Sequence, residues 1–241
     1  PFNTAVTESY NGTNWTEVND LNTVRAFLSG AGTQTAALAF GGDDPSPNRL
    51  ANTELWNGTN WTEVNDLNTA RQSLASAGTQ TAALAFGGNT PTIVAVTETW
   101  NGTNWTEVND LNTARSLLAG AGATNTAALA FGGNPPELAI TETWNGTNWT
   151  EVADLNTARR NLGGIGTNTA ALAFGGTPGG ALTETWNGTS WTELNDLNTS
   201  RADLGGAGTN TAGLAFGGTP PTTGATEEWN AGPVTVTFDV S

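Results

Sequence analysis

Carboxylates and guanidinium groups carry the ionisable chemistry of this sequence, which has seven Arg, no Lys and 22 Asp or Glu residues. The chain contains no His and no Cys, so the usual general base, thiolate nucleophile and imidazole metal ligand are missing. A pair of carboxylates could act as acid and base, but the acidic residues are copied in every unit of an internal repeat, whereas a catalytic pair should break that symmetry. We therefore expect that the protein is not an enzyme and carries no cofactor.

Ca²⁺ takes its ligands from carboxylate and carbonyl oxygens, and Asp43, Asp44 and Asp203 could supply such carboxylates. No EF-hand loop or regularly spaced Asp motif surrounds these residues. We therefore expect them to be solvated loop residues, and the sequence predicts no metal site.

Five of the arginines occupy the same place in the repeat. They are Arg25, Arg71, Arg115, Arg159 and Arg201. Such a set could form a ring that binds a carboxylate or phosphate group, because the guanidinium fork matches both. A charge repeated identically in every unit is more often the structural partner of a buried carboxylate, and residues of the Glu98 and Asp110 type are available for that role. We expect the structural pairing.

The repeat is clearest in TETWNGTNWTEVNDLNTAR, residues 97–115. Its second Trp recurs with a spacing of 46 residues between Trp15 and Trp61, which shrinks to 42 residues between Trp149 and Trp191. Periods in this range belong to propellers or helical arrays. Asn-Gly between two alternating segments favours strands, because it is the preferred sequence of a type I′ hairpin turn.

We predict a two-residue hairpin in which Thr97–Trp100 pairs with Thr103–Val108 and Trp100 lies opposite Thr103. Both Trp and both Glu side chains then share one face of the sheet. The aromatic residues could stack on sugars, but a face with two large aromatics must be covered, and the next copy of the unit is the nearest candidate. Core packing is therefore the expected role of the Trp residues.

The rest of each unit predicts two further strands. The segment LLAGAG at 117–122 is rich in small residues and suits an inner strand near a central axis, where backbones crowd. The segment TAALAF, which ends at Phe131 in this copy, is small or apolar throughout, as expected where both faces of a strand are buried.

This order of elements resembles the kelch repeat of β-propellers. The residues that carry the resemblance in one copy are Phe131-Gly132-Gly133, Trp144, Trp149 and Arg159, and the match recurs over about residues 20–230. The resemblance implies blades of four strands in the order A, B, C and D, with A innermost. Kelch-like oxidases use copper with Tyr and His ligands, whereas this chain has one Tyr and no His, so the resemblance carries the fold and not that activity.

Five Phe-Gly-Gly segments and five repeated arginines predict five blades. We expect an all-β protein, a five-bladed β-propeller of four-stranded antiparallel blades. Residues 1–232 should form this single kelch-like propeller domain, and residues 233–241 a C-terminal tail strand. The ring should close by pairing of N- and C-terminal strands, with the D strand at 14–18 completing the last blade beside the strands of 201–229.

Only the segments that follow each Gly-Gly differ strongly between copies. These inserts are residues 43–52, 89–96, 134–140, 177–182 and 219–225. Propeller geometry places them on one rim, where variable loops on a constant scaffold form a recognition surface. The candidate contact residues for a protein or glycan partner are Asp43, Asp44, Arg49, Thr92, Ile93, Glu137, Leu138, Pro178 and Thr222.

The last nine residues, PVTVTFDVS, alternate between apolar and polar side chains. The apolar positions are Val234, Val236, Phe238 and Val240. Such a strand left in water would promote aggregation, so we expect it to pair with a sheet edge. The edge could lie on its own closing blade or on a neighbouring subunit, and the second arrangement would give a homo-oligomer.

A net charge of −15 disfavours binding to nucleic acid or to anionic membranes, which needs clustered cations. No segment approaches the roughly 18 apolar residues of a membrane span, so no membrane insertion is expected. The WNGT arrays resemble those in structural proteins of bacteriophages and marine microbes. We expect a non-enzymatic structural, assembly or adhesion component, extracellular or in a virion or cell-surface appendage. The alternative is a free-standing carbohydrate- or protein-binding propeller.

Overall fold

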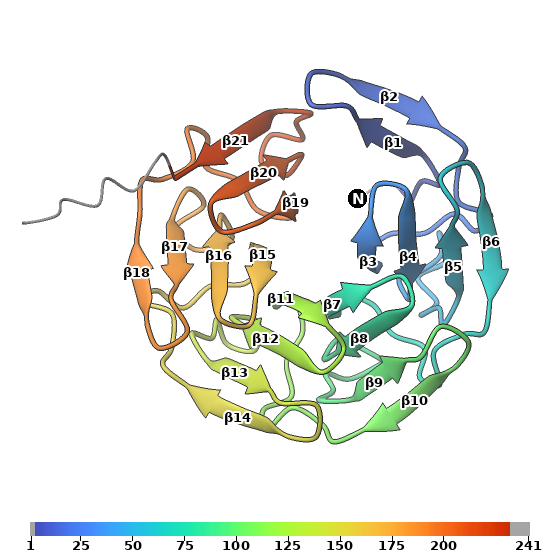
Figure 1. The fold of residues 1–241 in the computed structure, drawn as a ribbon, viewed down its shortest axis with the longest axis horizontal. Helices are drawn as coiled ribbons and strands as arrows, with labels where there is room; N and C mark the ends of the chain where they lie inside the picture. Colours follow the sequence, from blue (N-terminus) through green and yellow to red (C-terminus); the bar gives the residue numbers. More distant parts are fainter. Residues whose placement is uncertain (1–2, 232–241) are drawn as a thin grey trace, which may run out of the picture.

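The structure, a computed structural model, describes residues 3–231. It is all-β: strands joined by turns and loops form five blades around a central channel, as Figure 1 shows. The prediction of a five-bladed β-propeller is confirmed. No helix in the described part of the chain is long and apolar enough to cross a membrane.

Each blade runs outward from an inner strand A through B and C to D. The first blade is β3 (Ser29–Thr33), β4 (Ala36–Phe40), β5 (Thr53–Trp56) and β6 (Trp61–Val64). The second is β7 (Ala75–Thr79), β8 (Ala82–Phe86), β9 (Thr97–Trp100) and β10 (Trp105–Val108). The third is β11 (Ala119–Thr124), β12 (Ala127–Phe131), β13 (Thr141–Trp144) and β14 (Trp149–Val152). The fourth is β15 (Gly163–Thr167), β16 (Ala170–Phe174), β17 (Thr183–Trp186) and β18 (Trp191–Glu193).

The fifth blade has three strands among the described residues, β19 (Gly205–Gly208), β20 (Ala212–Phe216) and β21 (Thr226–Asn230). A separate hairpin precedes the first blade and consists of β1 (Thr7–Tyr10) and β2 (Trp15–Val18). All pairs of adjacent strands are antiparallel; those of the third blade, for example, run in the order β11, β12, β13 and β14.

Small residues let the inner strands converge on the axis. A Cβ atom on Gly120 of β11 would lie 2.5 Å from the carbonyl oxygen of Ser76 in β7, a distance that no side chain can occupy. The five A strands line a channel of about 440 Å³. The B strands of the first four blades are largely buried on both faces, and Leu84, Ala85 and Phe86 of β8 are completely inaccessible. These placements match the roles expected for the LLAGAG and TAALAF segments.

The prediction of a two-residue hairpin loop is wrong, because the loop is two residues longer. Trp100 lies opposite Trp105, so the loop contains four residues, Asn101 to Asn104. The side chain of Asn101 accepts hydrogen bonds from the backbone N–H groups of Thr103 and Asn104, both at 2.9 Å, and this Asx turn replaces the type I′ turn. A shift of two residues leaves every side chain on its predicted face, because the side-chain period of a strand is two.

The second Trp of each unit joins neighbouring blades. The indole of Trp149 packs on the ring of Phe86 in the preceding blade, with 4.9 Å between the ring centroids, and its Nε1 donates to Thr97 Oγ1 at 3.0 Å. The same contacts recur for Trp105 and Trp191. The expected core role of the aromatic residues is thereby confirmed.

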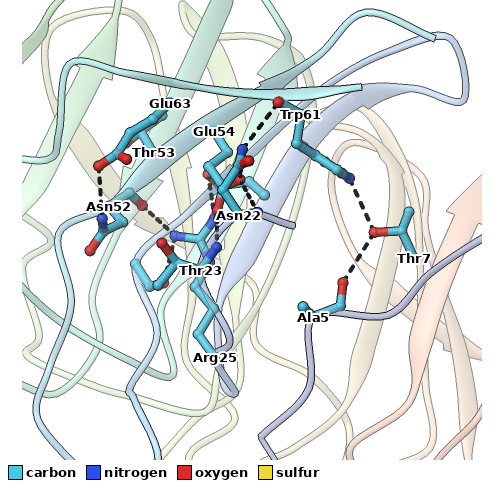
Figure 2. Close-up of polar contacts among 12 residues, drawn as sticks. Ala5, Thr7, Asn22, Thr23, Arg25, Asn52, Thr53, Glu54, Trp61 and Glu63 are labelled. Atoms are coloured by element: carbon cyan, nitrogen blue, oxygen red, sulfur yellow. Dashed lines mark hydrogen bonds and ion pairs between the residues drawn. The ribbon is translucent and has the colours of Figure 1, made fainter. Parts of the chain in front are cut away.

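Each repeated Arg pairs with a Glu on the C strand of its own blade, and this Glu is buried in the first four blades and partly buried in the fifth. Figure 2 shows the first copy, in which Arg25 lies 3.2 Å from Glu54 and donates to the carbonyl oxygen of Asn52 at 2.6 Å. The other Glu54 oxygen accepts from the backbone and the side chain of Asn22, at 2.7 and 2.8 Å. The corresponding pairs are Arg71–Glu98, Arg115–Glu142, Arg159–Glu184 and Arg201–Glu227. The expected structural pairing is confirmed.

Closure of the ring differs from the expected edge pairing. Within residues 3–231, β2 pairs with β1 and not with β21, so the N-terminal strands form a sheet of their own. The hairpin packs against the fifth blade: the tilted rings of Trp15 and Phe216 have their centroids 4.9 Å apart, and Trp15 Nε1 donates to Thr226 Oγ1 at 3.0 Å. The physical reason is that β1 already pairs along one edge of β2, the edge by which a D strand would otherwise pair with the C strand β21. The proposed tail strand at 233–241 and its boundary at 232 lie outside the described residues.

Candidate functional site: the variable-loop face

The five inserts lie at one end of the blades, where each is tied to the start of strand A. In the third blade the N–H of Ser116 donates to the carbonyl oxygen of Asn134 at 3.1 Å, and the N–H of Asn134 donates back at 3.0 Å. The same backbone bridge forms in every blade, at Ala26–Asp43, Gln72–Asn89, Arg160–Thr177 and Ala202–Thr219. Constant backbone contacts therefore hold the loops whose sequences differ.

Five residues, one from each blade, surround the axis at this end of the channel. We call these five the axial residues: Phe27, Ser73, Leu117, Asn161 and Asp203. The N–H of each axial residue after Phe27 donates to the carbonyl oxygen of the axial residue in the preceding blade at 2.9 Å, which gives four bonds from Ser73→Phe27 to Asp203→Asn161. The axial residues differ in every copy, although the residue that follows each of them, such as Leu74 or Leu118, is always Leu. Together with the five inserts they form the variable-loop face.

All five axial residues have a left-handed backbone, with φ between 52° and 56°. This conformation is unusual for a residue with a side chain, and especially for a bulky one such as Phe27 or Leu117. The bonds between neighbouring blades impose it, and Phe27 keeps 37% of its surface exposed. The strained backbone thus lies at a position where the residue type differs in every copy.

The first insert contains three predicted contact residues with different roles. Asp43 is buried, and its backbone bridges to both Ala26 and Arg49. Asp44 is partly exposed, and its carboxylate accepts hydrogen bonds from Ser46 and Asn48, which hold the pKa of this group below its ordinary value. Arg49 reaches the second insert, donating to the carbonyl oxygen of Thr90 and to Asn89 Oδ1, both at 2.9 Å. The first two inserts therefore form one connected surface.

The remaining predicted residues lie in the other inserts. Thr92 is exposed at the tip of its loop, and Ile93 is half-buried beneath it. Glu137 forms an exposed ion pair with Arg160 of the next blade at 3.4 Å, and the backbone of Leu138 anchors its loop to Gly133. Pro178 and Thr222 are exposed. Val234, Val236, Phe238 and Val240 lie outside the described residues.

Two buried acceptor atoms on this face have no hydrogen-bond partner within the described structure, Asp43 Oδ1 and Gln72 Oε1. They belong to the first and second blades and are closed off from solvent, and such buried acceptors without a partner are uncommon. The carboxylate of Asp203 instead accepts from Asn161 and Thr219. Over residues 3–231, no three acidic side chains are grouped so that they could hold a metal ion.

Sequence reasoning found the inserts but missed the axial residues. The available signal was a position two residues after each repeated Arg that differs in every copy, between the constant Arg and a constant Leu. A scan of the chain against family models and a search of curated proteins gave no match. The function must therefore be argued from the geometry of this face.

Proposed function

We propose that the protein is a non-enzymatic structural or adhesion component that binds a protein or glycan through its variable-loop face. The observation that carries this proposal is the coincidence of sequence variation with one surface. The axial residues and the inserts differ between copies, whereas the buried Arg–Glu pairs and the Trp contacts between blades are repeated. A scaffold that is constant in its core and varied on one face is suited to recognition.

The chemistry of the face suits a ligand that is both apolar and polar. Phe27 and Leu117 offer apolar surface near the axis, while Asn161 and Asp203 offer polar groups beside them. Sugars and exposed peptide loops both combine these features.

The proposal is tested by a glycan array probed with the intact protein and with a uniform-face variant. That variant carries Ser at all five axial positions, as at Ser73, and the six-residue insert 177–182 in every blade. The matched control carries Thr→Ser at the exposed outer positions Thr62, Thr106, Thr150 and Thr192. Binding by the intact protein and the control, but not by the uniform-face variant, is the expected result. Equal binding by all three would overturn the role of the face.

Within the same proposal, the resemblance of the WNGT repeats to arrays in structural proteins of bacteriophages and marine microbes supports a location in a virion or cell-surface appendage. The assembly element is residues 233–241, with its four alternating apolar positions. Deletion of these residues should leave a folded monomeric propeller and abolish self-association, as measured by sedimentation. If the intact protein sediments as a monomer and the deletion unfolds it, the free-standing binding module is the better assignment.

A further inference from the structure

The β1–β2 hairpin occupies the outer half of a blade position that lies between the fifth and first blades. Trp61 of the first blade donates to Thr7 Oγ1 of β1 at 3.1 Å, as Figure 2 shows, in the same way that Trp105 donates to Thr53 of the blade before it. Trp15 of the hairpin makes the corresponding bond to Thr226 of the fifth blade. The hairpin therefore supplies the C and D strands of this position.

No described strand fills the A and B places inside the hairpin. Figure 1 shows β19 and β3 on either side of an opening in the circle of inner strands. The opening is a cleft of about 770 Å³ lined mainly by apolar side chains, among them Trp15, Trp61, Leu38, Leu214 and Phe216. Within residues 3–231, β1 pairs with β2 alone, so its inner edge borders the cleft without a partner strand.

Comparison with the other blades shows what the cleft walls lack. Leu214 and Phe216 are half-buried, whereas Leu172 and Phe174, their counterparts in the fourth blade, are 2% and 3% exposed. The side chains of Leu214 and Phe216, at this wall of the opening, are therefore more exposed than their counterparts in the fourth blade.

The first blade shows the same deficit on the opposite wall. Trp61 packs on Trp56 but has no Phe ring from a preceding B strand within the described structure, unlike the other Trp residues at this place. A Cβ atom added to Gly30 of β3 would contact only Leu38 of its own blade. At the equivalent Gly164 of the fourth blade, the added Cβ would contact Phe131 and Gly120 of the preceding blade. Both walls are shaped to receive an A–B hairpin.

We infer that the cleft is a docking site for a β-hairpin of the same A–B type as the five in the ring, supplied by a polypeptide segment outside residues 3–231. The partner needs a Gly/Ala-rich inner strand, because β3 offers a backbone surface that admits close approach. Its second strand needs an apolar run that ends in Phe, which would pack on Trp61 and pair by backbone hydrogen bonds with β1.

Length distinguishes the possible occupants. Each A–B hairpin needs at least the twelve residues seen from Ser29 to Phe40. The ten residues 232–241 are too few for two such strands and their turn, and they lack the Gly/Ala-rich segment. The occupant that fits both walls is therefore a hairpin from another segment, and a second copy of the chain is one source of it.

A synthetic peptide of residues 115–133, the A–B segment of the third blade, tests the inference on the intact protein. We expect one-to-one binding by calorimetry, a rise in melting temperature with peptide concentration, and slower hydrogen exchange in β1 and β3. The Phe131→Ala peptide should bind about tenfold more weakly or worse, because the Phe contact with Trp61 is lost. A peptide of scrambled sequence is the matched control.

Each other outcome has a defined meaning. Absence of binding to the intact protein and to a variant lacking 233–241 overturns the inference, as does protection confined to strands other than β1 and β3. Binding only to the shortened variant also overturns it, because the chain's own last residues would then be the occupant. Self-association of the variant lacking 233–241 that the peptide reverses supports the inference and identifies a second copy as the source.

Discussion

Arg115 Nη2 donates to Glu142 Oε1 at 3.1 Å, and both side chains are completely buried. Burial lowers the pKa of Arg115 to about 10, although the nearby Glu142 opposes that shift. Removing one partner leaves the other charge buried and unpaired, so Arg115→Ala should cost about 3–5 kcal/mol in the free energy of unfolding. Denaturant titration measures this loss.

The control is Arg160→Ala in the same region of the chain. Arg160 is 37% exposed and its ion pair with Glu137 is a surface contact, so the cost should be about 0–1 kcal/mol. Equal losses for the two variants would contradict the structural role of the repeated arginines.

The Trp contacts between blades can be tested with one isosteric change. Thr97→Val removes the acceptor of the buried Trp149 Nε1–H, which should lower the free energy of unfolding by about 1–3 kcal/mol. Thr106→Val, at an exposed position in the facing strand, should change it by about 0.5 kcal/mol or less. Equal free energies of unfolding for the two variants, measured by denaturant titration, would show that the indole hydrogen bond does not stabilise the contact between blades.

Gly87 marks the place where one blade meets the backbone of the next. Its φ is 65°, and a Cβ there would lie 2.6 Å from the carbonyl oxygen of Arg115. Gly87→Ala should therefore cost about 1–3 kcal/mol for the clash in addition to about 1–2 kcal/mol for the backbone conformation. Gly12→Ala, with φ at 93° and no atom within 4 Å of the new Cβ, should carry the backbone cost alone. Thermal unfolding of both variants compares them, and a larger loss at Gly12 would refute this account.

The pKa of Asp44 offers a local test of the first insert. Hydrogen bonds from Asn48 and Ser46 lower this pKa relative to an unfolded Asp. The stabilisation is therefore present above the unfolded pKa of about 3.9 and is lost as the pH falls through the folded value. Carbon NMR should show Asp44 titrating below an ordinary Asp, and Asn48→Ala should raise its pKa. An unchanged pKa in Asn48→Ala would show that the side-chain bond is not the cause.

Repetition made the fold readable from the sequence. The five Phe-Gly-Gly segments and the paired Trp residues predicted the blade number, the strand order and the buried face, and the buried Arg–Glu pairs followed from the same periodicity. The hairpin loop was less readable. Asn101-Gly102 is compatible with a two-residue turn and with a four-residue Asx loop, and both keep Trp100 and Trp105 on one face.

The closure and the centre of the candidate site depend on contacts between distant segments. Trp15 reaches Phe216 across 201 positions of sequence, a contact that no local pattern encodes. The left-handed backbone of Phe27 and Leu117 is imposed by hydrogen bonds from neighbouring blades, so their own residue types argue against it. The inserts were predictable because Pro and Gly mark them as loops; the axial residues were not.

The most direct test of the proposed function is the affinity of the strongest array ligand for the protein after substitution of the axial residues alone. The variant carries Ser at positions 27, 117, 161 and 203, which matches Ser73 and leaves the inserts and blades unchanged. Calorimetry should show at least about a tenfold loss of affinity, corresponding to about 1.4 kcal/mol, with an unchanged melting temperature. Full affinity in this variant and in the uniform-face variant would contradict the claim that this protein acts through its variable-loop face.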